Sequence, residues 1–167
     1  EKAKRWHNDQ KSMREMLAES DAHEVIDGVN IGNQAIMEIA LAMLYLGEGF
    51  KKNLDTGMGN SDPMILRFFL AILLNVFKVP IGVIRCSLHL RIDQDSDIEK
   101  RYWSDQLGVP LGNFKQSVYD KRTSGQATYE GYHGVCVVSC GRVAIQRKLV
   151  YLGRAYCNLV MRKLAGG

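Results

Sequence analysis

The chain has 167 residues, enough for one domain with a hydrophobic core, and its 46% apolar and 24% charged residues are typical of a globular protein. Its formal net charge of +4 is too small to indicate nucleic-acid binding by itself, so the distribution of charge must decide that question. The longest apolar stretch, residues 39–46, is too short to span a membrane, and no secretory signal pattern opens the chain. We therefore predict a cytoplasmic protein without a membrane partner.

Residues 1–30 are predicted to form a helical arm or linker outside the main domain, which spans residues 31–167. A charged helix is expected over residues 1–20, because apolar residues recur there at loose helical spacing: Trp6, Met13, Met16 and Leu17. The chain begins with Glu1 rather than Met, so we expect that an upstream segment is missing.

The next predicted helix, residues 34–48, is apolar on nearly all sides, which favours burial on more than one face. We expect it to pack on its own sheet and against another helix. It ends with Glu48, followed by the turn residue Gly49. The negative end of the helix dipole disfavours a carboxylate at this place. Metal coordination beside a phosphate-binding surface would give Glu48 a reason to be there.

Residues 50–53 and 58–60 are predicted to pair as a hairpin. Asp62 and Pro63 then form a strong start signal, a capping residue before a first-turn proline, for a helix that reaches about residue 77.

Residues 83–91 alternate in polarity, as a half-buried strand does. One face would carry Val83, Arg85, Ser87 and His89, and the other Ile84, Cys86, Leu88 and Leu90. Ser96 and Glu99 match a capping box that opens a helix over residues 97–107. Two further strands (114–119 and 134–139), a polar loop between them and a final helix (143–164) complete an α+β pattern.

The predicted sheet has one apolar and one basic face. The residues expected to bind nucleic acid are Lys51, Lys52, Arg85, Ser87, His89, Arg91, Lys115, Lys121 and Arg122. Such a surface suits contacts to phosphates and to base edges in the major groove. The alternative is a solvated outer face, which any antiparallel sheet can have.

Other reactive side chains are interpreted as structural. No cysteine belongs to a C-x-x-C pair, so buried reduced thiols are expected at Cys86 and Cys136. The acidic run at residues 93–97 lacks the glycine and glutamate of a calcium loop, and a helix cap explains it better. His133 has no acid partner placed by the sequence, so structural or phosphate-contact roles outweigh catalysis. Trp103 is expected to anchor the core.

The segment Leu41-Ala42-Met43-Leu44-Tyr45-Leu46-Gly47-Glu48-Gly49 resembles the motif of the LAGLIDADG homing endonucleases. Residues 60–77 are similar to the second half of that family's repeat. Residues 102–114 and 132–137 resemble segments of prokaryotic DNA-binding relatives. The likeness covers roughly residues 32–152.

This resemblance implies a LAGLIDADG-like α+β domain whose curved antiparallel sheet is packed by helices and binds double-stranded DNA, with a nucleoid-associated location. One motif copy supplies half of the saddle that a duplex needs. We therefore expect a homodimer through the 34–48 helix, or a monomer tethered by a missing domain. Structured RNA is an alternative ligand, because group I intron maturases use a similar scaffold. A pure protein-interaction domain is the second class of function.

In the family, an acid from each of two motif helices holds divalent metals. The resemblance therefore makes Glu48 a candidate catalytic residue and metal ligand, with the Gly47 carbonyl as a helper and Mg²⁺ as the cofactor. Glu48 stands where the motif has Asp, and Met43 replaces a small residue, which would widen helix packing. We therefore favour a regulatory DNA-binding protein with cleavage reduced or lost, and no cofactor. The alternative is an active divalent-metal-dependent endonuclease acting as a homodimer, and a structural role for Glu48 is also open.

Overall fold

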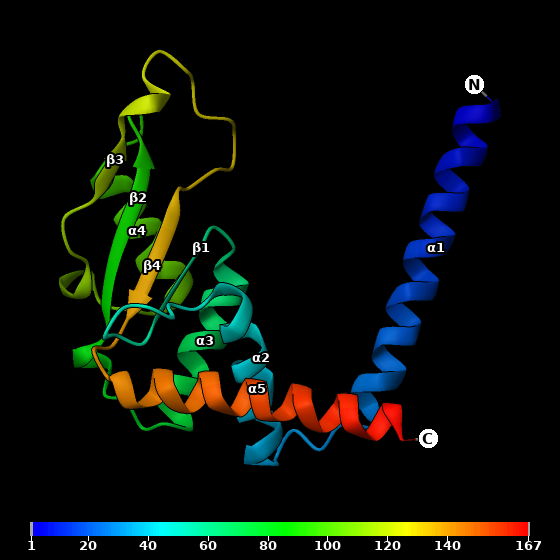
Figure 1. Ribbon diagram of the computed structural model, residues 1–167. Helices are drawn as coiled ribbons and strands as arrows, with labels where there is room; N and C mark the ends of the chain where they lie inside the picture. Colours follow the sequence, from blue (N-terminus) through cyan, green and yellow to red (C-terminus); the bar gives the residue numbers. More distant parts are fainter. Residues whose placement is uncertain (1, 167) are drawn as a thin grey trace. The chain divides into compact units, whose positions relative to one another are not determined.

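The computed structural model describes residues 2–166 and has an α+β architecture (Figure 1). The described residues form five α-helices and one four-stranded sheet. The chain divides into two compact units, the first ending at Asn33 and the second beginning at Gln34. None of the helices in this range is long and apolar enough to cross a membrane.

Helix α1 (Lys2–Asp27) makes up most of the first unit. It continues past residue 20, where we predicted its end, and stops before the turn at Gly28. Its larger apolar side chains are exposed: Trp6, Met13, Met16, Leu17, Val25 and Ile26.

Helix α2 (Gln34–Glu48) has the predicted bounds and is buried on several sides, as expected. Leu41, Ala42 and Tyr45 are fully buried among α5 (Val143–Ala165), α3 (Pro63–Asn75) and the first strand. The Tyr45 hydroxyl donates to the Phe50 carbonyl at 2.9 Å and accepts from the Gly57 amide at 3.3 Å. Burial raises the pKa of Tyr45 to about 12.

The cap of α3 is the one predicted, because Asp62 accepts a hydrogen bond from the Met64 amide at 2.8 Å and Pro63 follows it. The cap of α4 (Ser96–Leu107) differs from the prediction. Asp95, not Ser96, accepts from the amides of Asp97 and Ile98, because Asp95 is the residue whose extended backbone precedes the first helical turn. The Glu99 side chain is therefore free to make contacts elsewhere.

The sheet has the strand order β1-β4-β2-β3. Its strands are β1 (Gly57–Asn60), β2 (Arg85–Arg91), β3 (Val118–Asp120) and β4 (Val135–Ser139). β4 is antiparallel to β1 and β2, which confirms that segments 83–91 and 134–139 share one sheet. The expectation of a fully antiparallel sheet was wrong, because β3 pairs parallel with β2. The helix α4 carries the chain back between them, as a parallel crossover requires.

One predicted strand is absent, and another begins later than expected. Residues 51–55 form bends instead of the first arm of a hairpin, and the backbone pairing with β1 on this side comes from Gly49 and Phe50. The segment that was predicted to pair from residue 114 begins as a strand only at Val118. Three short 3₁₀ helices complete the described structure: Ile81–Val83, Leu111–Asn113 and Lys121–Thr123.

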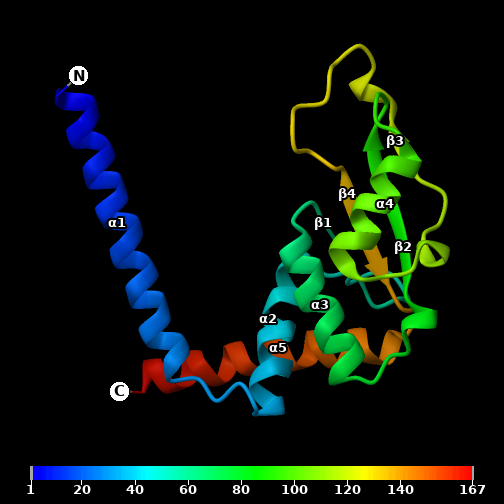
Figure 2. The ribbon, with the colours of Figure 1, turned by 180° about the vertical axis from the view of Figure 1, so that it is seen from behind.

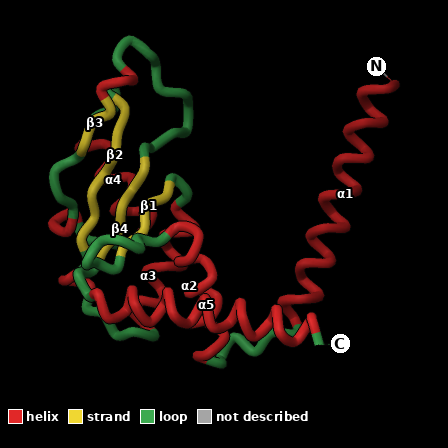
Figure 3. The backbone as a smooth tube through the Cα atoms, viewed as in Figure 1, coloured by secondary structure: helices red, strands yellow, loops and turns green. Residues whose placement is uncertain are grey.

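Helices α3 and α4 cover one face of the sheet (Figure 2). The buried side of β2 points there, and its members are Cys86, Leu88 and Leu90. Trp103 is fully buried in this layer, which confirms its role as a core anchor. The opposite face of β2 carries exposed side chains, while α5 crosses near the end of the sheet where β2 begins (Figure 3).

The cysteines are free, and Cys86 and Cys136 are buried as predicted. The neighbouring Cys86 thiol and burial together raise the pKa of Cys136, so both side chains pack as small apolar groups.

Candidate nucleic-acid interface

Four of the predicted binding residues stand together on the open side of β2. Arg85, Ser87, His89 and Arg91 alternate with the buried residues of the strand, and Arg85 and His89 are exposed. Across the register, β4 places Ser139, Val137 and Val135 beside the first three. The basic character of this face therefore comes from β2, and its neighbour β4 supplies a half-buried apolar margin.

A pocket of about 480 Å³ lies at the end of this face, between β2, β3 and the loop of residues 121–134. His89, Arg91, Tyr119, Arg122 and Tyr132 contribute to its walls. The Arg91 Nη2 atom lies 3.4 Å from the Gln126 carbonyl oxygen and 3.5 Å from that of Ala127, so it holds the loop. The buried Arg91 Nε has no hydrogen-bond partner in the described residues. A ligand in this pocket would therefore meet a guanidinium that is already oriented.

The two cations at the start of the loop differ in how free they are. Arg122 makes a bidentate contact with Asp120, with both N–O distances 2.9 Å, and this contact lowers the pKa of the Asp120 carboxyl. Much of the Arg122 charge is therefore balanced within the chain. Lys121 is exposed and has no such acid partner among the described side chains. Lys115 is also exposed, and its amide donates to the Cys86 carbonyl at 2.7 Å, next to β2.

The loop is fastened at its other end by His133. The His133 Nδ1 atom lies 2.8 Å from Glu99 Oε2, and the imidazole stacks on Tyr102 with ring centroids 3.5 Å apart. The Trp103 indole donates to the His133 carbonyl at 2.7 Å. Glu99, which is nearly buried, is the acid partner that the sequence did not reveal. No local signal could have found it, because the two residues lie far apart along the chain.

Lys51 and Lys52 lie away from the strand face. They line a groove between the bent segment 51–54 and α5, together with Arg147 and Arg154. They lie in the connection between α2 and β1, and Gln146 of α5 holds this segment by hydrogen bonds to the carbonyls of Asn53 and Asp55. Sequence reasoning also missed the α5 arginines, although their spacing of seven residues places them on one helix face.

Glu48 is exposed at the end of α2 and forms no ion pair with the described side chains. The Lys51 ammonium donates to the Gly47 carbonyl at 3.2 Å, so a positive charge sits where that oxygen would bind a metal. No group of three His, Cys, Asp or Glu side chains suited to a metal occurs within residues 2–166.

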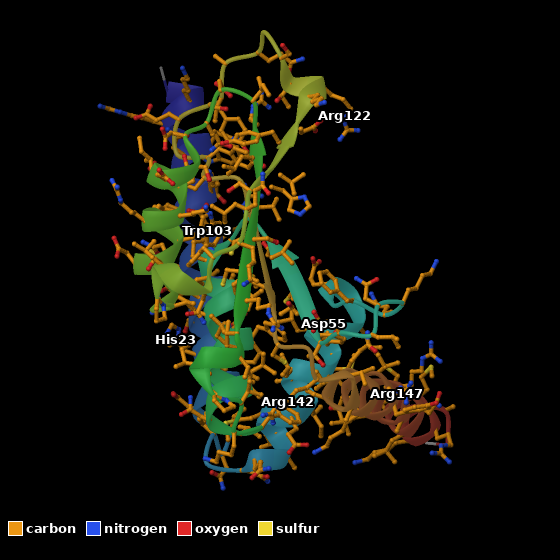
Figure 4. All side chains as sticks on the ribbon, turned by 90° about the vertical axis from the view of Figure 1, so that its left-hand side faces the viewer. His23, Asp55, Trp103, Arg122, Arg142 and Arg147 are labelled. Atoms are coloured by element: carbon orange, nitrogen blue, oxygen red, sulfur yellow. The ribbon has the colours of Figure 1, made fainter. Side chains whose placement is uncertain are left out.

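The candidate interface thus consists of the open side of β2 and the pocket beside it, and the groove on α5 is a separate basic surface. Figure 4 shows Arg122 and Arg147 on one side of the sheet and Trp103 of α4 on the other. Comparisons of the chain with protein-family models, with curated proteins and with solved structures found no match.

Proposed function

We propose that this protein binds double-stranded DNA through the open side of β2 and acts as a regulator, on a LAGLIDADG-like scaffold. One observation carries the proposal: two arginines, a serine and a histidine share one side of a strand whose other side is locked into the core. Burial of Cys86, Leu88 and Leu90 fixes the register of the strand. The polar set is therefore presented as a rigid row.

The spacing of that row suits a duplex. Alternate residues of a strand are about 6.7 Å apart, and successive base pairs of B-DNA are about 3.4 Å apart. Side chains of Arg85, Ser87 and His89 would then meet every second base pair or phosphate along a groove. Arginine pairs well with guanine, and serine accepts or donates to several base edges.

The test is the salt dependence of duplex binding, measured for wild type and Arg85→Gln. The Arg85 side chain makes no hydrogen bond or ion pair in the described structure, so the substitution should leave the fold intact. If it contacts a phosphate, the slope of log K against log salt becomes shallower by about 0.9. Arg101→Gln is the matched control. Arg101 is exposed on α4, the helix that covers the other face of the sheet, so this variant leaves the slope unchanged. Absence of duplex binding by the wild type at low salt would refute the proposal, and preference for duplex RNA in competition would redirect it.

We also propose a homodimer through α2. Within its own chain α2 buries Leu41, Ala42 and Tyr45. Another side of the helix, with Ala40, Met43 and Gly47 at helical spacing, remains exposed. Met43 adjoins an apolar patch formed with α5, whose other members are Tyr156, Cys157, Val160 and Met161. A second copy of α2 would cover this surface.

The alternative function is metal-dependent DNA cleavage. The observation in its favour is the exposed Glu48 carboxylate, which forms no ion pair with a described side chain and ends the helix proposed for the dimer. In the LAGLIDADG family an acid from each of two motif helices holds the metal, so Mg²⁺ would need Glu48 from both copies. That requirement makes cleavage the second candidate.

A further inference from the structure

The groove between residues 51–54 and α5 has a volume of about 250 Å³ and is lined by four cations. They are Lys51, Lys52, Arg147 and Arg154. No acidic side chain lines it, and none of the four forms an ion pair among the side chains that the structure describes. Lys51 donates only to a neutral carbonyl, that of Gly47. The groove therefore keeps its positive charge.

A buried side chain, that of Gln146, holds the two walls of the groove together. Gln146 is 5% exposed, and its Nε2 atom shares its hydrogens among the carbonyls of Phe50 (2.8 Å), Asn53 (2.6 Å) and Asp55 (3.1 Å). The backbone amide of Gln146 donates to Thr56 Oγ1 at 2.8 Å. These bonds fasten segment 51–55 to α5, so the lysines are held against the arginines. Like charges repel, and holding them together is unfavourable without an anion to offset it.

The α5 wall also carries an aromatic side chain. Arg147, Tyr151 and Arg154 recur at i, i+4 and i+7, which places them on one face of the helix. Tyr151 is 72% exposed and has no described hydrogen-bond or ring partner. It offers a hydroxyl and a flat ring between two guanidinium groups, a combination suited to a sugar-phosphate chain.

We infer that this groove is a second phosphate-binding surface, which grips the backbone of the duplex beyond the part that β2 contacts. The inference rests on the proposed DNA binding and adds α5 to it. Arg147 lies on the same side of the sheet as Arg122, opposite α4 (Figure 4). One duplex on that side could therefore meet both the strand and the helix.

The experiment compares Arg147→Gln/Arg154→Gln with wild type in duplex binding over a range of salt concentrations. Loss of two phosphate contacts makes the slope of log K against log salt shallower by about 1.8 and weakens binding at every salt concentration tested. Lys51→Gln/Lys52→Gln, from the opposite wall, has the same effect. Arg147→Lys/Arg154→Lys keeps the charge and retains most of the slope. Arg67→Gln/Arg101→Gln, on α3 and α4, removes the same charge from the covered face and serves as control. Thermal unfolding verifies that each variant is folded.

The outcomes separate the two proposals. If the wild type binds duplex DNA and the α5 variant keeps its full affinity and slope, the groove proposal is overturned while DNA binding by β2 stands. If the α3 and α4 control loses as much affinity and slope as the α5 variant, the effect comes from net charge alone, and the groove proposal is also overturned. If Arg85→Gln weakens binding but the α5 variant does not, β2 acts alone. If the wild type binds no duplex at low salt, both proposals fail.

Discussion

At the scale of single residues, Glu48 and Lys51 place a negative and a positive charge at the C-terminal end of α2. Lys51 contacts the Gly47 carbonyl, where the negative end of the helix dipole favours a cation. Glu48 projects from the same turn without an ion pair among described residues, where the dipole disfavours it. A carboxylate so close to a basic groove must repel phosphate unless a metal or a second chain offsets it.

Replacing Glu48 by Gln tests this repulsion. For a protein that only binds DNA, we expect affinity to rise roughly two- to fivefold at low salt, because an exposed charge interaction is worth about 0.3–1 kcal/mol. Titration of labelled duplex measures it, and Asp105→Asn on α4 is the control. Strand scission by the wild type with Mg²⁺ or Mn²⁺, lost in Glu48→Gln while binding persists, would instead favour the endonuclease.

At the scale of elements, the loop of residues 121–134 is held by contacts at several points. Asp93 accepts from the Thr128 amide at 2.7 Å and from its hydroxyl at 2.6 Å. The His133–Glu99 contact secures the far end. This loop forms one wall of the pocket beside Arg91, so the contacts that hold the loop in place determine the shape of the pocket.

The Asp93 contact predicts a pH effect. The bonds from the Thr128 side chain and amide lower the pKa of Asp93 below its ordinary value of 3.8. A lowered carboxyl pKa means that the stabilisation is present above 3.8 and is lost as pH falls through the lower folded-state value. In an NMR titration, the Asp93 carboxyl and the Thr128 amide should shift together at that lower pH. Thr128→Val should move the Asp93 pKa back towards 3.8, and an unchanged midpoint would contradict the contact.

The crossing of α2 and α5 depends on a glycine. A Cβ atom at Gly153 would lie 2.7 Å from Leu46 Cδ1 and 3.1 Å from the Ala42 carbonyl oxygen. We expect Gly153→Val to lower the free energy of unfolding by about 1–3 kcal/mol, because the helices must move apart. Chemical denaturation measures the change. Gly47→Ala is the control, since its Cβ meets nothing within 4 Å and stability should stay equal or rise by up to about 1 kcal/mol. Equal stability of Gly153→Val and wild type would show that the helices are not so close.

Local signals in the sequence were sufficient for features decided within a few residues. The Asp62-Pro63 cap and the alternation along β2 are of this kind, because capping and one-sided burial leave short-range patterns. Contacts between distant segments left no such pattern. Gln146 reaches back to the carbonyls of segment 50–55, and that contact turned a predicted hairpin arm into one wall of a groove. The strand of the candidate site was therefore predictable, whereas its α5 portion was not.

At the scale of the molecule, the fold covers one side of its sheet with helices and leaves cations on the other. A twofold dimer would join two such surfaces and double the row of contacts along a duplex. Its symmetry would favour pseudo-palindromic DNA, because the two half-sites must match the two copies.

Met43→Glu tests the dimer, because Met43 is 38% exposed and lies in the apolar patch that α2 shares with α5. We expect light scattering to give twice the mass of one chain for the wild type and the mass of a single chain for the variant. A charge buried in an interface without a partner is strongly unfavourable, whereas on the surface of a folded monomer it costs little. Met64→Glu, at a 66% exposed position of α3, should leave the dimer intact. The Met43 variant should also lose any preference for a palindromic duplex over its half-site. A wild-type protein that stays monomeric at high concentration, with and without DNA, would remove the symmetric assembly and leave each chain to bind through β2 and α5 alone.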